Sequence, residues 1–177
     1  MDDIAAAAGV SKQTIYTHFS SKEQLFGELV LSNADRVSQF LDRIEALVAQ
    51  PDLAESLAEL ARDYIRFVIR PEVLRLRRLV LGEAGRFPEL ARRYYELVPE
   101  RVYQALAKSL QTLADQQRLC VDHPLIAAGH FAWLALGMPL DRGMFSPGEA
   151  ALSDAEVDHQ AQAAVRVFLA AYGPRTP

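Results

Sequence analysis

The segment GVSKQTIYTHFSSKEQLF, residues 9–26, predicts a short helix between two turns and then the start of a longer helix. Gly9 follows an Ile- and Ala-rich run over residues 2–8 and can take the positive φ with which many helices end. Ser11 is a good N-cap for the next helix, predicted over residues 12–19. Within that helix Ile15 and Phe19 are four residues apart, so they share one face and pack against the rest of the protein.

The face opposite Ile15 is polar and rich in hydrogen-bonding groups. Lys12, Gln13, Tyr16 and Thr17 lie on it or at its edge. Two helices joined by a short turn that contains glycine are typical of the helix-turn-helix unit. The second helix of that unit enters the major groove of DNA and contacts bases with its N-terminal half.

The next signal is a helix start at residues 20–26. Ser21, with Gln24 three residues later, forms a capping-box pattern directly before an apolar run. The free backbone N–H groups of such a helix start, with Lys22 beside them, are suited to a phosphate group.

These elements together resemble the DNA-binding signature of the TetR family of bacterial transcription regulators. The matching residues are Gly-Val-Ser at 9–11, Thr-Ile-Tyr-Thr-His-Phe at 14–19 and Ser-Lys-Glu-Gln-Leu at 21–25. The resemblance implies that the helix over residues 12–19, with Ser11 at its start as N-cap and DNA contact, is a recognition helix for palindromic operator DNA. Its implied contacts to base edges come from Lys12, Gln13 and Thr17. Its implied contacts to phosphates come from Thr14, Tyr16, His18 and Lys22.

The chain departs from the family pattern at its start. TetR-like proteins carry one more helix before the helix-turn-helix, whereas Met1 falls inside what corresponds to the second helix. We therefore expect a truncated domain over residues 1–24, in which Ile4 and Ile15 lose part of their apolar cover. Two readings stay open: the protein starts upstream of Met1, or this form has lost much of its DNA binding.

Charge gives the DNA-binding prediction no independent support. Over residues 1–24 the two lysines are outweighed by Asp2, Asp3 and Glu23, and the whole chain has a formal net charge of -4. Phosphate binding usually rests on a basic surplus. The single cysteine, Cys120, excludes an internal disulfide framework and, with no visible signal peptide, indicates a cytoplasmic protein without a membrane segment.

Beyond residue 24 the apolar residues recur every three or four positions, which predicts an all-α fold. The second predicted domain, residues 25–177, is a helical ligand-binding and dimerisation bundle. A long helix should end before Pro51, a later one should stop at Pro71, and Pro99 should kink another. The predicted helices cover residues 26–48, 53–68, 72–82, 90–113, 124–140 and 154–172.

The last two predicted helices, 124–140 and 154–172, are the expected homodimer interface. The first is apolar nearly all round, so it must be covered on more than one side. In TetR-like proteins the corresponding pair of helices forms a four-helix interface with a second subunit.

A small-molecule effector is expected between the middle helices. The resemblance implies an apolar cavity there, and the scarcity of isolated charges in the apolar stripes favours a hydrophobic or aromatic ligand. The arginines between residues 70 and 101 alternate with glutamates, which indicates a solvated, salt-bridged face. The candidate pocket residues are aromatic: Tyr64, Phe67, Phe87, Tyr94, Tyr95, Tyr103 and Trp133.

No pattern in the sequence indicates an enzyme, a cofactor or a metal site. The four histidines fall in different segments without a metal-ligand spacing, and there is no glycine-rich phosphate loop or nucleophile elbow. The sequence predicts a ligand-responsive transcription regulator, a repressor released from its operator by its ligand. The alternative is a helical small-molecule-binding or dimerisation module that no longer binds DNA.

Overall fold

The computed structural model describes residues 5–6, 9–21, 24–25, 27–28, 34–146 and 152–174. All regular structure in these residues is helical, which confirms the predicted all-α class. The elements are α2 Lys12–His18, α4 Ala34–Ala46, the 3-10 turn η1 Leu47–Ala49, α5 Leu53–Val68, α6 Pro71–Glu83, α7 Pro88–Tyr95, the π-helical turn η2 Glu96–Glu100, α8 Arg101–Asp115, α9 Pro124–Phe145 and α10 Asp154–Tyr172.

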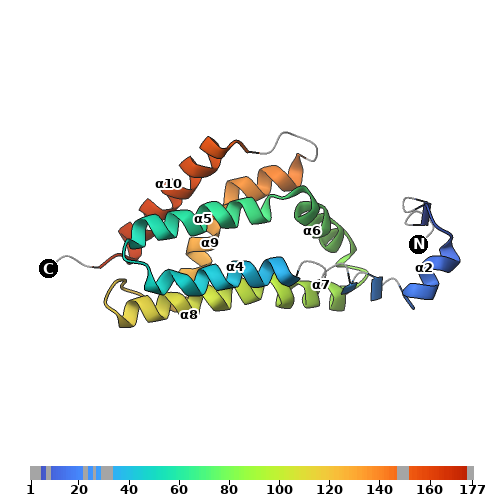
Figure 1. Ribbon diagram of the computed structural model, residues 1–177, viewed down its shortest axis with the longest axis horizontal. Helices are drawn as coiled ribbons and strands as arrows, with labels where there is room; N and C mark the ends of the chain where they lie inside the picture. Colours follow the sequence, from blue (N-terminus) through green and yellow to red (C-terminus); the bar gives the residue numbers. More distant parts are fainter. Residues whose placement is uncertain are drawn as a thin grey trace.

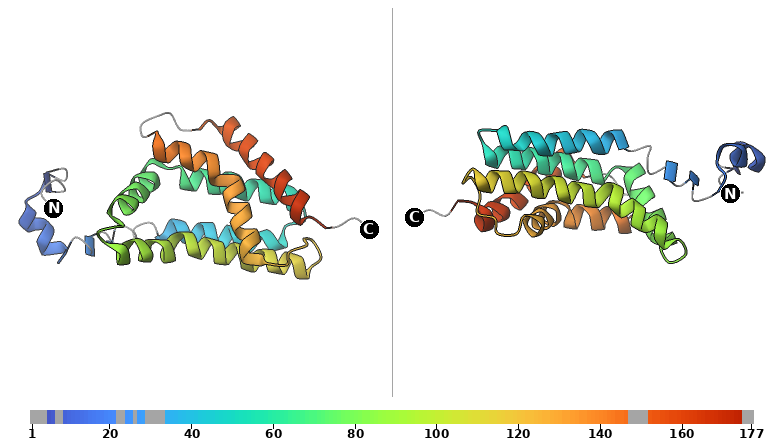
Figure 2. Two further views of the ribbon diagram at one scale, coloured as in Figure 1. Left: turned by 180° about the vertical axis from the view of Figure 1, so that it is seen from behind. Right: turned by 90° about the horizontal axis from the view of Figure 1, so that it is seen from below.

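Three long helices, α4, α5 and α8, run side by side along the length of the molecule (Figures 1 and 2). The α6 and α7 helices close the bundle at one end. The α9 helix crosses the bundle and ends beside α6, and α10 returns to the opposite end (Figure 1). The α2 helix lies beyond the α6–α7 end, far from the C-terminus (Figure 1). The fully buried core contains large side chains from five helices: Ile44, Leu57, Ile65, Leu106, Leu110, Leu113, Phe131 and Phe168.

Local sequence signals account for the limits of α5. Asp52 is its N-cap, and the Asp52 carboxylate accepts a hydrogen bond from the Glu55 backbone N–H at 3.0 Å. Leu57, Ala61 and Tyr64 then recur on the buried face. The helix ends at Val68, shortly before Pro71, which becomes the first residue of α6.

The predicted kink at Pro99 takes the form of a π-helical turn. The five residues Glu96–Glu100 separate α7 from α8, and Pro99 lies inside this turn. Proline has no N–H to donate to the preceding turn, so the hydrogen-bond pattern has to change around it. The single predicted helix over residues 90–113 is therefore two helices that meet at a wider turn.

The α9 helix is longer than predicted. It continues through Pro139 to Phe145, so the end at residue 140 was wrong. A proline in a helix interior costs about 3 kcal/mol, but here the last turn of α9 is held by burial of Leu140 and by a 2.8 Å hydrogen bond from the Arg78 guanidinium to the Gly143 carbonyl. Figure 2 shows that α9 bends along its length. The bend is explained by Pro139, because proline has no backbone N–H to donate to the preceding turn of the helix.

Within the described part of the chain, no helix is both long enough and apolar enough to cross a membrane.

Candidate functional site

The turn before α2 is built as the sequence predicts. Gly9 has a φ of +65°, and the backbone N–H groups of Val10 and Gly9 donate to the carbonyls of Ala5 and Ala6 at 3.0 and 3.3 Å. This pair of bonds is the Schellman arrangement, in which a left-handed residue ends a helix. The chain direction at the start of α2 is therefore fixed by Gly9.

Ser11 caps α2. Its Oγ accepts a hydrogen bond from the Thr14 backbone N–H at 3.0 Å and lies 2.8 Å from the Thr14 hydroxyl oxygen. Ile15 is buried at 6% exposure, and Phe19, just after the helix, is half-buried. The apolar side of the helix is thus covered, as its spacing predicted, and the expectation that Ile15 would lose part of its cover was wrong.

The polar side of α2 is open to solvent. The Thr17 hydroxyl donates to the Gln13 carbonyl at 2.9 Å, which leaves its oxygen able to accept a further hydrogen bond. Lys22, the remaining predicted DNA contact, lies outside the described residues. The exposed predicted contacts are Ser11, Lys12, Gln13, Thr14, Tyr16, Thr17 and His18.

The capping pattern after α2 differs from the prediction by one residue. The Ser21 hydroxyl accepts from the Gln24 backbone N–H at 3.1 Å, as expected for an N-cap. The Gln24 side chain, however, accepts from the backbone N–H and the hydroxyl of Ser20, at 2.6 and 2.8 Å, and not from the Ser21 N–H. A glutamine side chain is long enough to reach one residue further, and Ser20 offers it two donors.

The predicted pocket residues Tyr64 and Phe67 belong to a stack of aromatic rings on α5. The Phe40 ring of α4 lies 4.9 Å from the Tyr64 ring and 5.8 Å from the Phe67 ring, with both pairs stacked. Such ring pairs are favourable beyond the area that they bury. Phe40 was not named in the sequence analysis; its spacing of three residues from Val37 and four from Ile44 is the signal that could have found it.

Two further predicted pocket residues, Tyr94 and Tyr103, act on the pKa of Tyr64. Burial, above all, raises the pKa of Tyr64, and the neighbouring hydroxyls of Tyr103 and Tyr94 raise it further. Tyr95 acts in the same direction on Tyr103, which also has a side-chain hydrogen bond with Trp133. Tyr95 and Trp133 are themselves exposed, at 50% and 53%.

Phe87, the seventh predicted pocket residue, is placed differently. It is the N-cap residue of α7, and the Arg86 guanidinium carbon lies 5.1 Å from the centre of its half-buried ring. A cation over an aromatic face at this distance is attracted by the ring quadrupole. This contact stabilises the turn between α6 and α7.

One charged residue belongs to the aromatic group and was missed from the sequence. Arg77 of α6 is half-buried, and its positive charge opposes the rise in the pKa of Tyr64, Tyr94 and Tyr103. No ion pair joins Arg77 to a carboxylate anywhere in the described ranges of the chain. Its neighbours in sequence suggested a solvated face, because a sequence does not reveal which arginine turns inward.

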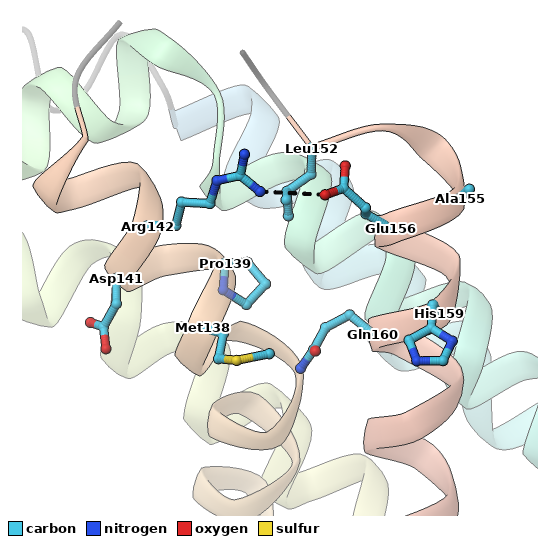
Figure 3. A pocket seen from close by; sticks show the side chains of 9 residues that line it. All are labelled: Met138, Pro139, Asp141, Arg142, Leu152, Ala155, Glu156, His159 and Gln160. Atoms are coloured by element: carbon cyan, nitrogen blue, oxygen red, sulfur yellow. Dashed lines mark hydrogen bonds and ion pairs between the residues drawn. The ribbon is translucent and has the colours of Figure 1, made fainter. Parts of the chain in front are cut away.

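A cleft of about 660 Å³ lies where the end of α9 meets the start of α10 (Figure 3). Arg142 and Glu156 form an ion pair across it at 3.3 Å, and the Gln160 amide donates to the Leu134 carbonyl at 2.8 Å. The cleft therefore lies on the helix pair for which dimerisation was predicted. It is lined by Met138, Pro139, Asp141, Arg142, Leu152, Ala155, Glu156, His159 and Gln160.

Among the described residues, no group of three or more histidine, cysteine, aspartate or glutamate side chains is arranged to hold a metal ion.

A capped helix with an exposed polar face, attached to an all-helical bundle, defines a transcription regulator of the helix-turn-helix class. Two family profiles match the chain. The profile "Bacterial regulatory proteins, tetR family" matches residues 1–29, and "AefR-like transcriptional repressor, C-terminal domain" matches residues 55–174. The chain belongs to the TetR family, and the resemblance stated from the sequence is confirmed.

Solved structures agree with this assignment. A TetR-family transcriptional regulator from Mesorhizobium loti MAFF303099 is 38% identical, with a TM-score of 0.86 over 97% of this chain and 85% of that one. The flavonoid-responsive regulator FrrA is 35% identical, with a TM-score of 0.75 over 99% and 87%. A TetR-family regulator from Pseudomonas syringae pv. tomato str. DC3000 is 27% identical, with a TM-score of 0.76 over 99% and 86%. No curated protein matches the chain.

Proposed function

We propose that this protein is a ligand-responsive repressor that binds a palindromic operator through α2 and leaves it when a hydrophobic or aromatic small molecule binds. The observation that carries the proposal is the exposed polar face of α2, held at a fixed angle by the Gly9 turn and the Ser11 cap. A rigid helix with exposed hydrogen-bonding side chains can read base edges in the major groove.

The proposed base contacts and phosphate contacts of α2 are assigned from the length and position of each side chain. Lys12, Gln13 and Thr17 read bases, because they project from the start and middle of the exposed face. The flanking groups position the helix on the backbone. These phosphate contacts come from Thr14, Tyr16, His18 and Lys22.

The proposed effector site lies among the aromatic side chains of α5, α7, α8 and α9. The hydroxyls of Tyr94 and Tyr103 are close enough to raise the pKa of Tyr64, and Trp133 is hydrogen-bonded to Tyr103. Aromatic surfaces with a few polar groups are typical of small-molecule sites. A relative of this chain is described as flavonoid-responsive, and a flavonoid is an aromatic molecule.

The proposed dimer uses α9 and α10. Ile126 and Trp133 on α9 and Val167 on α10 are more than half exposed, and a Cβ added to Gly129 or Gly137 would meet no atom within 4 Å. Exposed apolar side chains around small residues mark a surface that a second helix can approach closely. A two-fold dimer would present two α2 helices to the two halves of a palindrome.

One observation favours the second candidate, a ligand-binding or dimerisation module without DNA binding. Residues 1–24 hold three acidic residues against two lysines, so the proposed DNA-binding domain lacks the usual basic surplus. Residues 25–177, the proposed ligand-binding and dimerisation domain, could bind a ligand and dimerise without the DNA-binding domain.

Selection of bound DNA from a random pool separates the two candidates. The repressor proposal predicts enrichment of a palindrome whose half-sites lie about one helical turn apart. Gln13→Ala should abolish the enriched sequence preference, whereas Gln111→Ala, a change on the exposed side of α8, should leave it intact. Recovery of no preferred sequence by the unaltered chain would support the module without DNA binding.

A further inference from the structure

The cleft between the end of α9 and the start of α10 is separate from the aromatic group proposed for the effector. Its volume of about 660 Å³ is within the range of small-molecule sites. Its lining includes no residue of the aromatic group and none of the exposed side chains that mark the proposed dimer surface. Much of the lining is apolar: Met138 and Pro139 from α9, Leu152 just before α10, and Ala155 in its first turn (Figure 3).

The charged groups on the two sides of the cleft neutralise each other. The Glu156 carboxylate accepts from the Arg142 guanidinium at 3.3 Å and from the backbone N–H and the hydroxyl of Ser153, each at 2.8 Å. In Figure 3 the Arg142–Glu156 pair spans one side of the cleft, whereas the Asp141 carboxylate points away from α10. A charged ligand would have to compete with this pair and give up its own hydration. The cleft therefore suits a molecule without charge.

Two polar side chains of α10 remain available to such a molecule. The Gln160 amide donates to the Leu134 carbonyl at 2.8 Å, which fixes its orientation and leaves its Oε1 as an acceptor. Figure 3 shows this side chain reaching across the cleft toward Met138. His159, on the rim, has no hydrogen bond or ion pair with another residue that the structure describes. The group on the ligand that complements the Gln160 oxygen is a hydroxyl or N–H donor.

We propose that this cleft is a small-molecule site in addition to the proposed effector site, and that it takes an uncharged, mainly apolar molecule with a hydroxyl group, of the alkylphenol class. The hydroxyl donates to the Gln160 Oε1, and the apolar body lies against Met138 and Pro139. The Met138 side chain is 74% exposed, and its flexible thioether can fold over such a body. The site goes beyond the proposed function, because it requires neither the operator nor the aromatic group.

The test uses three matched probes: para-butylphenol, its methyl ether para-butylanisole, and the anion para-butylbenzoate. The NMR signal of an isotope-labelled Met138 methyl group reports from inside the cleft, and Met138→Leu identifies it among the three methionines of the chain. We expect the phenol to shift this signal and to bind several-fold more tightly than the ether, as one hydrogen bond allows. The benzoate should bind at least about ten-fold more weakly than the phenol. Equal binding of all three probes, or no shift with the phenol, would overturn the proposal.

A substitution at Gln160 tests the proposed acceptor. Gln160→Leu removes the amide oxygen and keeps a side chain of similar size, so it should weaken the phenol several-fold and leave the ether unchanged. Gln162→Leu is the matched control, since Gln162 is exposed on the same helix, lies outside the cleft and donates to Asp158. An equal loss of phenol and ether affinity in Gln160→Leu would contradict the proposed hydrogen bond.

A second substitution keeps the test decisive if Gln160→Leu does not fold. Ala155→Phe fills the cleft from an exposed position and should abolish binding of phenol and ether, whereas Ala170→Phe, exposed near the other end of α10, should leave both unchanged. Retained binding in Ala155→Phe would overturn the proposal.

Two other occupants are recognised by the same signals. A change in the fluorescence of Trp133, the only tryptophan of the chain, without a shift at Met138 would place the probe in the aromatic group and reject the cleft as its site. A Met138 signal that follows the protein concentration and ignores the probes would show that a second copy of the chain fills the cleft, which also rejects the proposal. Operator binding enters none of these measurements, so a failure of the repressor proposal is seen separately.

Discussion

Gly9 shows how much of the candidate DNA-binding site depends on a single residue. Its φ of +65° is needed for the two hydrogen bonds that turn the chain into α2. This part of the site could be predicted from the sequence, because glycine, the serine cap and the buried Ile15 act within a few residues of one another. Local signals of this kind need no knowledge of the rest of the fold.

We predict that Gly9→Ala lowers operator affinity by about ten-fold. An L-residue in the left-handed conformation costs about 1–2 kcal/mol, and the turn would relax and misdirect α2. The measurement is the dissociation constant for the selected operator. Gly27→Ala is the control: Gly27 is helical, and a Cβ there meets no atom within 4 Å. An equal effect of both substitutions would refute the role given to Gly9.

A second prediction at the residue scale concerns the core. Leu113 of α8 is fully buried, and Leu113→Ala should lower the free energy of unfolding by about 2–5 kcal/mol because it leaves a cavity. Leu81→Ala removes the same atoms from a side chain that is 60% exposed and should change little. Urea unfolding at one fixed protein concentration compares the two variants. A small loss in Leu113→Ala would mean that the bundle collapses around the gap.

Arg77 marks the limit of sequence reasoning at this scale. Its sequence neighbours are other arginines and glutamates, which is the pattern of an exposed face. Only the packing of α6 against α7 and the orientation of α5 place it near Tyr64 and Tyr94. The aromatic candidates could be found from residue type, but the position of a positive charge beside them depends on tertiary structure.

At the scale of elements, α10 begins with a complete capping box. The Ser153 hydroxyl accepts from the Glu156 N–H at 3.3 Å, and the Glu156 carboxylate accepts from the Ser153 N–H at 2.8 Å. The hydrogen bonds from the Ser153 backbone and hydroxyl, together with the ion pair to Arg142, lower the pKa of Glu156 from its ordinary 4.5. The start of α10 therefore prefers the ionised carboxylate.

This pKa gives a pH-dependent prediction. Because the pKa of Glu156 is lower in the folded protein, its contribution to stability is present above pH 4.5 and is lost as the pH falls through the folded value. Glu156→Gln should remove that part of the acid sensitivity. The difference in urea midpoint between the two proteins should shrink as the pH falls below 4.5. Glu59→Gln, at an exposed position of α5, is the control and should show no such trend.

Pro99 and Pro139 show why the ends of the helices were harder to predict than the presence of the helices. At Pro99 the chain adopts a π-helical turn and a new helix follows, whereas at Pro139 the helix bends and continues. The local rule is the same in both places. The outcome differs because Leu140 and Gly143 pack against other helices, and such contacts are not visible in the local sequence.

At the scale of the whole molecule, the dimer proposal makes a direct prediction. Val167→Glu places a charge on the proposed interface of α10 and should convert a dimer into a monomer at micromolar concentration. Leu81→Glu puts the same charge on α6, outside the interface, and should leave the dimer intact. Sedimentation velocity measures both. A monomer in the unaltered protein, or a dimer in Val167→Glu, would contradict the assignment of this surface.

The hydrogen bond from Arg78 to the Gly143 carbonyl joins α6, the helix of Arg77, to the last turn of α9. Under the proposed function, α9 carries Trp133 of the effector site and also forms the dimer interface, so one helix contacts both the effector and the second subunit. Coupling between two binding equilibria is reciprocal. An effector that weakens subunit association must therefore bind the dimer more weakly than the monomer, and one that strengthens association must bind the dimer more tightly. The effector concentration needed for induction would therefore depend on the cellular concentration of the regulator itself.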